Sequence, residues 1–251
     1  MPAVVMLKPA EKRMPAPPKH EVGCSSCNLR ELCLPAGLCA EDLMRVENVV
    51  YARRKVKRGD ALFTAGAGFN AVYAIRSGFF KSIIVDRDGR EQVTGFFMGG
   101  ELVGLDGIGS GTYHASAIAL EDSEVCVLPY ALVEQMAREV PALQRHLHAI
   151  LSREIVRDHG VMMLLGSMRA EERLATFLLN LSRRFLRRGY SASDFHLRMT
   201  REEIGSYLGL KLETVSRLFS QFQRDGLIEV EQKHVRIVDI AGVERVLASA
   251  A

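Results

Sequence analysis

The chain has 251 residues, a formal net charge of +3 and 48% hydrophobic residues, a composition typical of a soluble protein with a packed core. It has no apolar stretch of membrane-spanning length and no signal-peptide pattern, so we expect a cytoplasmic protein that does not enter the membrane. Five cysteines, an odd number, in a reducing compartment argue against a framework of structural disulfides.

The N-terminal segment is rich in proline, with five of the eight prolines within residues 1–18. A proline-rich segment whose apolar residues are interrupted by charges cannot bury enough surface to become ordered. We therefore expect a disordered tail over residues 1–19.

Four cysteines after this tail are candidate metal ligands. Three form a C-x2-C-x5-C run and one lies far downstream: Cys24, Cys27, Cys33 and Cys126. Thiolate sulfur selects zinc, copper(I) or iron–sulfur clusters. Three clustered ligands with one remote partner are common for clusters, whereas zinc sites usually combine two C-x-x-C knuckles, so the spacing favours a cluster and leaves zinc open. We interpret Cys39 as a bystander thiol of the core, with a substitute ligand or a redox partner as alternatives.

The middle of the chain has the pattern of a β-rich domain. Twelve of the 21 glycines lie between Gly59 and Gly111. Short apolar runs are spaced among and after them, over residues 71–76, 79–85, 92–98, 114–120 and 124–128. Short strands separated by glycine turns predict a β-sandwich, barrel or roll, with a hairpin tip at residues 86–89.

A single long helix is predicted to begin near Pro141 and to end near Gly166. Apolar residues recur along it with helical spacing: Leu143, Leu147, Leu151, Ile155, Met162 and Leu165. From Leu151 the steps alternate between four and three residues, which is the seam pattern of a helix that pairs with another helix. Asp158 falls on this seam, where it would face its symmetry mate in a homodimer. A surface aspartate beside a slightly slipped stripe explains the pattern equally well.

The last third of the chain, from Ser167, is predicted to be helical and rich in arginine. Residues 182–188 (SRRFLRR) interleave basic and apolar side chains. Such a run is usually the solvated face of a helix, and beside a DNA-binding element it is a candidate phosphate contact.

A winged helix-turn-helix is predicted next. Thr200 and Glu203 form a capping box at the start of one helix, and Gly209 ends that helix in a tight turn. The elements predicted to follow are a helix over residues 212–224 and two strands over residues 227–230 and 235–238. Two helices joined by a glycine turn and followed by a hairpin are typical of this DNA-binding fold.

Glu213, Ser216 and Arg217 share one face of the second predicted helix because they are spaced i, i+3 and i+4. Arginine can donate to guanine O6 and N7 while glutamate accepts from cytosine N4, so this face is suited to one G·C pair. An ordinary ion pair between Glu213 and Arg217 is the alternative. The turn and wing around them favour base recognition.

These features together resemble the FNR branch of the CRP/FNR transcription regulators. The resemblance covers nearly all of the chain after about residue 20, and it is carried by the four-cysteine pattern and the stretches GELVG (100–104), AEERLA (170–175) and ETVSR (213–217). It implies an α+β fold with a β-roll of the cyclic-nucleotide-binding (jelly-roll) type, a long dimerisation helix and a C-terminal winged helix-turn-helix. The implied divisions are an iron–sulfur arm and β-roll over 20–137, the helix over 138–166 and the DNA-binding domain over 167–251.

The resemblance also implies a function. It suggests a regulator rather than an enzyme, in which the four cysteines bind a [4Fe-4S] cluster and a homodimer binds double-stranded DNA. In this family oxygen degrades the cluster, the dimer dissociates and DNA binding is lost. The residues expected to recognise a TTGAT-type half-site are Glu213, Ser216 and Arg217. The residues expected to form the dimer switch are Leu151, Ile155, Asp158 and Met162. The residues expected to contact RNA polymerase are Asp86, Gly89 and Arg90.

Cyclic nucleotides are not expected to bind, although related regulators bind them in the β-roll. A phosphate needs a cation or a ring of backbone N–H groups. The cyclic-nucleotide branch has an arginine followed by serine or threonine in the segment that is TYHASA (112–117) here. No Lys or Arg occurs between Glu91 and Ala137.

Two alternatives stay open. One is a regulator of the same kind that is switched by zinc or by a thiol/disulfide change at the cysteines. The other is an iron–sulfur redox or electron-transfer protein, although the chain contains no catalytic constellation, glycine-rich cofactor loop or second cluster motif to support it.

Overall fold

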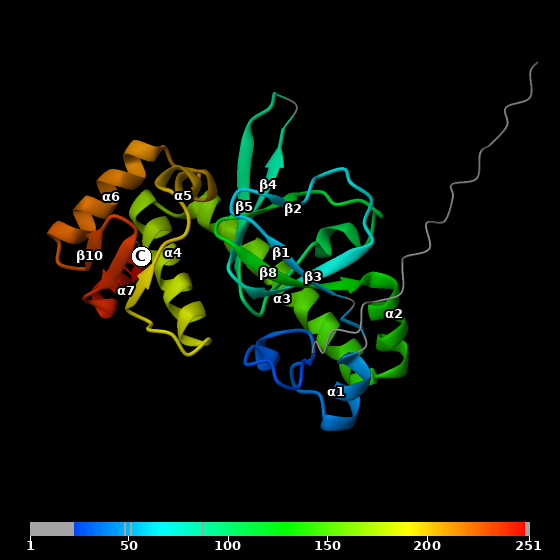
Figure 1. The fold of residues 1–251 in the computed structure, drawn as a ribbon. Helices are drawn as coiled ribbons and strands as arrows, with labels where there is room; N and C mark the ends of the chain where they lie inside the picture. The colour runs from blue at the N-terminus through cyan, green and yellow to red at the C-terminus, as the bar shows by residue number, and fades with distance from the viewer. Residues whose placement is uncertain (1–22, 48, 51, 87, 249–251) are drawn as a thin grey trace, which may run out of the picture.

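The computed structural model describes residues 23–47, 49–50, 52–86 and 88–248, and the predicted tail over residues 1–19 lies outside these ranges. The chain forms a β-roll, a long helix and a C-terminal domain (Figure 1). The predicted α+β fold class is confirmed. Within the described ranges, no helix is both long and apolar enough to cross a membrane.

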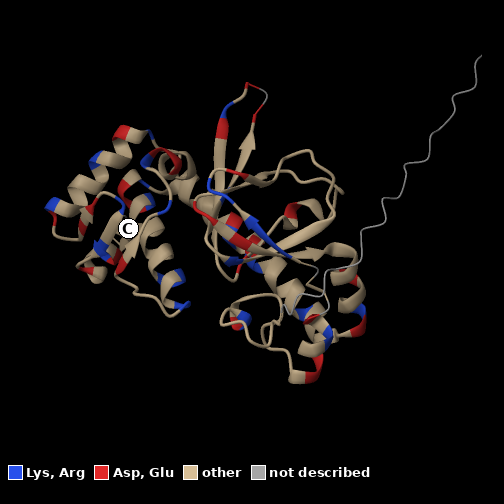
Figure 2. Cartoon of the chain, in the orientation of Figure 1, with Lys and Arg blue, Asp and Glu red and all other residues tan. Residues whose placement is uncertain are grey.

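Two antiparallel four-stranded sheets form the β-roll. Their strands are β1 (Ala52–Val56), β2 (Ala61–Phe63), β3 (Ala71–Ser77), β4 (Phe79–Val85), β5 (Glu91–Met98), β6 (Leu102–Val103), β7 (Ser116–Ala119) and β8 (Ser123–Pro129). The strand orders are β1-β8-β3-β6 and β2-β7-β4-β5. Each of the five apolar runs in the sequence overlaps one strand. The strands β1, β2 and β6 lack such a run, because β1 is a basic edge strand (Figure 2) and the other two are only three and two residues long.

Aromatic side chains fill the interior of the roll. The Phe63 ring stacks on Tyr113 with 4.0 Å between centroids and on Tyr73 with 5.7 Å. The Tyr113 hydroxyl donates a hydrogen bond to the Ala71 carbonyl at 2.7 Å. Gly104 has a φ of +87°, and a Cβ atom there would lie 3.0 Å from the Tyr113 ring, so this turn requires glycine.

Seven helices and a small three-stranded sheet complete the described fold. The helices are α1 (Ala40–Glu47), α2 (Tyr130–Glu139), α3 (Pro141–Ser167), α4 (Ala170–Leu186), α5 (Arg201–Leu208), α6 (Leu212–Arg224) and α7 (Ile240–Ala248). The sheet has the order β10-β11-β9 and comprises β9 (Asp194–His196), β10 (Ile228–Glu231) and β11 (His234–Ile237).

The long helix α3 begins at Pro141. Proline is tolerated in the first turn of a helix because the backbone N–H that it lacks would have no partner within the helix there. The predicted helix is confirmed. Its first half is buried against the β-roll side of the molecule through Leu143, Leu147 and Ile150. Its second half carries four apolar side chains that are 57–70% exposed: Ile155, Val156, Met162 and Met163. An apolar face left uncovered in one chain is suited to pack against another helix.

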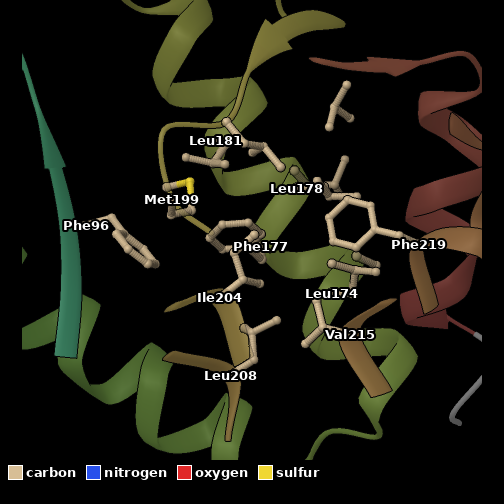
Figure 3. Packing of buried hydrophobic residues seen from close by; sticks show 14 of the residues in the cluster. Phe96, Leu174, Phe177, Leu178, Leu181, Met199, Ile204, Leu208, Val215 and Phe219 are labelled. Carbon is tan, nitrogen blue, oxygen red and sulfur yellow. The ribbon is translucent and has the colours of Figure 1, made fainter. Parts of the chain in front are cut away.

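The C-terminal domain is a winged helix-turn-helix, as predicted. Thr200 Oγ1 accepts a hydrogen bond from Glu203 N at 3.1 Å, and the Glu203 carboxylate accepts one from Thr200 N at 2.7 Å. Gly209 ends α5 with a φ of +62°, and α6 spans the predicted residues 212–224. Both helices pack on α4 around an apolar core (Figure 3).

The C-terminal domain also packs directly against the β-roll. The Phe96 ring of β5 lies beside the Phe177 ring of α4, with centroids 6.1 Å apart (Figure 3). Lys81 of β4 and Glu203 of α5 form an ion pair at 2.8 Å with side chains only 15% and 17% exposed. The two domains therefore share one apolar core and a polar interface.

Two arginines of the basic run clamp Glu101 of the β-roll. Arg184 and Arg188 each place Nη2 2.6 Å from a Glu101 carboxylate oxygen. The Arg188 side chain is only 6% exposed. At these two positions the expected solvated face or phosphate contact is wrong, because a buried carboxylate of the other domain takes up the charge.

Lowering the pH should weaken this interface. Burial by itself raises the pKa of the Glu101 carboxyl, but Arg184 and Arg188 outweigh burial and the net pKa lies below its ordinary 4.5. The pKa of Glu203 is lowered in the same way, against burial, by its partner Lys81. A carboxyl whose pKa is lowered by folding contributes stability that is complete above its unfolded pKa of about 4.3 and is lost as the pH falls through the folded value.

Thermal unfolding between about pH 7 and pH 3 measures this effect. We expect Glu101→Gln to be less stable at neutral pH by about 1.5–3 kcal/mol, the typical contribution of a charged hydrogen bond, and to lose less on acidification than the wild type. Glu202→Gln, at an exposed position of α5, is the control. An identical pH dependence in all three proteins would contradict the assignment.

Candidate functional site

The four cysteines predicted as metal ligands line one pocket. Cys24, Cys27 and Cys33 come from the N-terminal arm (residues 23–39, blue in Figure 1), and Cys126 comes from β8. All four are half-buried free thiols. The rest of the lining is mostly apolar and includes Leu34, Val46, Val49 and Leu128. A sheltered four-sulfur site is thus assembled from two distant parts of the chain.

Tight turns hold the three arm cysteines together. Cys27 N donates to the Cys24 carbonyl at 3.1 Å, and a 3-10 turn over Arg30–Leu32 leads directly into Cys33. Successive short turns keep these three side chains close in space without a long helix or strand. Residues that are close in the sequence are therefore also close in the structure.

Two contacts that the sequence does not predict tie the arm to neighbouring helices. The Glu47 carboxylate of α1 accepts a hydrogen bond from Ser25 N at 2.7 Å. His146 Nε2 of α3 lies 3.2 Å from the Cys33 carbonyl oxygen. Leu34, which follows Cys33, is 1% exposed and packs in the same apolar cluster as the first half of α3. The arm therefore contacts the long helix directly.

Cys126 is positioned by regular secondary structure. The strand β8 lies between β1 and β3, and Cys126 pairs with Arg53 on one side and Ala74 on the other. The strand order places Cys126 beside the arm. The spacing of residues in the sequence does not predict this proximity. Three basic residues also line the pocket: Arg30, Arg53 and Arg76.

Burial disfavours the ionised form of three of these thiols, Cys24, Cys33 and Cys126. Burial first, and then the nearby Cys126, raises the pKa of Cys24 from 9.0 to about 11, and burial raises the pKa of Cys33 to about 12. The pKa of Cys126 is raised chiefly by burial, with Arg53 opposing the shift. A metal that binds here would have to displace these protons, because metals bind thiolates.

The four thiols are the donor type that both structural zinc and iron–sulfur clusters take. Within the described residues, no three His, Cys, Asp or Glu side chains converge closely enough to hold one metal ion. Structural zinc needs four ligands around one point, with sulfur about 2.3 Å away. A four-iron cluster takes four cysteine sulfurs, which is the number that line this pocket.

Cys39 lies outside this pocket. It is exposed, and its carbonyl accepts the Leu43 N–H at 2.9 Å at the start of α1. The expectation of a thiol in the core is wrong, because the residue precedes a surface helix rather than a buried strand.

The predicted DNA-contacting residues lie at the start of α6. Glu213, Ser216 and Arg217 are exposed, on the face opposite the buried Val215 and Phe219. Among the described residues, neither Glu213 nor Arg217 has an ion-pair partner, so the alternative of an ion pair between them is not formed. This leaves their polar atoms available to a ligand.

Arg201 is a further residue of this domain that sequence reasoning missed. Its guanidinium carbon lies 3.2 Å from the centroid of the Phe219 ring, a cation–π contact between α5 and α6. Its Nη1 atom has no hydrogen-bond partner in the described part of the chain, and burial lowers its pKa to about 10. The contact links the first residue of α5 to the buried face of α6.

The predicted dimer-switch residues lie along one side of α3. Leu151 is half-buried, while Ile155, Asp158 and Met162 are exposed. Apolar side chains on both sides of Asp158 thus surround one exposed carboxylate.

The predicted polymerase contact is the tip of the β4–β5 hairpin, which projects from the roll in Figure 1. The Asp86 carboxylate accepts hydrogen bonds from Asp88 N at 2.8 Å and from Arg90 N at 2.9 Å. Gly89 has a φ of +79°, which this turn requires. Asp86, Gly89 and Arg90 therefore share one exposed turn.

Two protein-family models match the chain. A cyclic nucleotide-binding domain matches residues 53–139, and a Crp-like helix-turn-helix domain matches residues 172–246.

Curated relatives match most of the chain. The transcriptional regulatory protein btr of Bordetella pertussis is 45% identical over 94% of this chain and 98% of its own length. The transcriptional activator protein anr of Pseudomonas aeruginosa is 47% identical over 86% of this chain and 88% of its own. The fumarate and nitrate reduction regulatory protein of Escherichia coli is 42% identical over 86% of both. The solved structure of FixK2 from Bradyrhizobium japonicum is 30% identical, covers 80% of this chain and 98% of that one, and has a TM-score of 0.73.

Proposed function

Because this chain belongs to the FNR branch of the CRP/FNR family of DNA-binding transcription regulators, we propose that it responds to oxygen through a [4Fe-4S] cluster and is active as a cytoplasmic homodimer. The observation that supports this most is the pocket that four thiols from the arm and β8 line together with apolar side chains. Homologues that are transcription regulators also argue against an enzyme.

Cys24, Cys27, Cys33 and Cys126 would hold the cluster. When bound, it supplies a covalent link between the arm and β8 that oxygen can destroy. The arm is otherwise held by turns and by the contacts of Glu47, His146 and Leu34. Two of those contacts, of His146 and Leu34, join the arm to α3. A change in the position of the arm would therefore affect the helix that we propose to dimerise.

Anaerobic purification tests this proposal. We expect a brown protein with about four iron and four sulfide per chain. Its visible absorbance should be lost in air. A colourless protein loaded with zinc would support the zinc-switched alternative, and a metal-free protein whose thiols form disulfides in air would support the thiol switch. A cluster-loaded protein that fails to bind a TTGAT–N4–ATCAA duplex would revive the electron-transfer alternative.

The exposed half of α3 supports a homodimer in which Leu151, Ile155 and Met162 pair with a second copy. Asp158 lies among them and is exposed in the single chain. Two carboxylates facing each other across a helix seam repel. We propose that this repulsion keeps the cluster-free chain monomeric and that arm docking tips the balance.

Asp158→Ala should therefore dimerise without the cluster. The reason is that the alanine variant keeps the apolar seam and removes the like charges. Sedimentation of iron-free protein measures this, with His159→Ala, the next exposed residue, as the control. If Asp158→Ala stays monomeric at concentrations where loaded wild-type protein is dimeric, this role of Asp158 is refuted.

DNA recognition is proposed to use Glu213, Ser216 and Arg217 in each half-site. Their exposure near the N-terminal end of α6 suits entry into a major groove. A dimer places two such helices about one DNA turn, roughly 34 Å, apart, as a TTGAT–N4–ATCAA site requires.

Two further parts of the proposal concern what the roll binds or contacts. We propose that cyclic nucleotides do not bind, because the stacked rings of Phe63, Tyr73 and Tyr113 occupy the interior of the roll. We also propose that the hairpin tip at Asp86, Gly89 and Arg90 contacts RNA polymerase. Its projection away from the body of the chain supports this role (Figure 1).

A further inference from the structure

We propose that the turn Gly99-Gly100-Glu101 is a positioning element that transmits the state of the cysteine arm to the DNA-binding domain within a single chain. The link would act in addition to any change in dimerisation. It rests on the proposed function only in that the cluster sets the state of the arm.

The arm side of this link is a close contact with two glycines. A Cβ atom on Gly100, whose φ is +87°, would lie 2.8 Å from the Leu32 Cβ atom, and one on Gly99 would lie 3.0 Å from Leu29 Cδ1. Leu29 and Leu32 lie between Cys27 and Cys33, so they cannot keep their positions if these two ligands move. The glycines let the arm rest directly on the turn.

The turn is also bonded to the strand beside the fourth ligand. Gly100 N donates to the Ile75 carbonyl at 2.8 Å, and Ile75 N donates to the Glu101 carbonyl at 2.9 Å. Ile75 lines the cysteine pocket and pairs with Val125, the neighbour of Cys126. The turn therefore meets both halves of the cysteine site.

The other side of the link is the end of α4. Glu101 accepts from Arg184 and Arg188 at 2.6 Å each, and Arg188 Nε donates to the Gly99 carbonyl at 2.6 Å. Arg184 Nη2 also donates to the Phe96 carbonyl at 2.7 Å. These charged hydrogen bonds are largely buried, so they are stronger than surface contacts and sensitive to small displacements.

The helix α4 carries the core on which α5 and α6 pack (Figure 3). A displacement of the turn would thus change how the DNA-contacting helices are held, without any contribution from the exposed face of α3. Glu101 and Arg188 act through their neighbours in this scheme and touch neither cluster nor DNA.

Amide hydrogen exchange of peptides from the arm and from α4 tests the link. In the wild type, removing iron with a chelator should speed exchange in the arm and, on the order of tenfold, in the last turns of α4. In Glu101→Gln the arm should still respond, whereas α4 should exchange fast in both states. Glu244→Gln, which removes an exposed partner of Arg183 on α4, is the control and should respond like the wild type. A full α4 response in Glu101→Gln would overturn the proposal.

A second experiment is independent of the cluster. Leu32→Ala in iron-free protein, at concentrations where sedimentation shows monomers, should speed exchange in α4, and Met44→Ala, at an exposed position of α1, should not. Faster exchange confined to the arm would refute the link. Iron and sulfide analysis of the same samples reports separately on the proposed cluster.

Discussion

Cys126→Ser, purified without oxygen, is expected to contain less than about one iron per chain, against about four in the wild type, and to lose specific DNA binding. The serine oxygen is a poor replacement for a soft thiolate, and no other cysteine lies on the β8 side of the pocket. Iron and sulfide analysis together with the visible absorbance of the purified protein measures this result.

Cys39→Ser is the matched control for that variant. Because Cys39 is exposed and does not line the pocket, this change should leave iron and sulfide at wild-type values. Retention of a full complement of iron by Cys126→Ser would show that the arm holds the metal without β8, and the proposed coupling through Cys126 would fail.

Arg217→Ala is expected to weaken binding to TTGAT–N4–ATCAA by about 5- to 150-fold per half-site, which corresponds to about 1–3 kcal/mol for a bidentate contact with guanine. The variant should also discriminate less against a changed G·C pair, since the lost contact is specific to that base. Anaerobic fluorescence anisotropy with matched and substituted duplexes measures both effects.

Gln223→Ala, at an exposed position near the other end of α6, is the control and should bind both duplexes like the wild type. If Arg217→Ala weakened binding to all duplexes equally, Arg217 would be a phosphate contact rather than a base contact.

The DNA-binding domain could be predicted closely from the sequence because its determinants are local. The capping box of Thr200 and Glu203 and the left-handed Gly209 fix the ends of α5 by contacts within a few residues. The amphipathic pattern of α6 then sets its bounds, because its buried stripe packs on α4 and α5.

The cysteine site and the interdomain contacts depend on topology instead. Only the placement of β8 between β1 and β3 brings Cys126 to the arm. Arg184 and Arg188 have the sequence pattern of a solvated face, and only the packing of α4 on the roll gives them Glu101 as a partner. Contacts of this kind, between residues far apart in the chain, cannot be predicted from the spacing of residues in the sequence.

The position of Cys126 on an interior strand bears on how the proposed cluster would be reassembled after its loss. Because β8 is bonded on both sides, Cys126 would keep its place if the proposed cluster were lost, while the other three cysteines belong to one short segment of turns. Rebuilding the site then requires ordering that segment alone, at about 1–2 kcal/mol per residue, against a scaffold that stays folded. Under the proposed function, reassembly of the cluster would therefore not require the β-roll to refold.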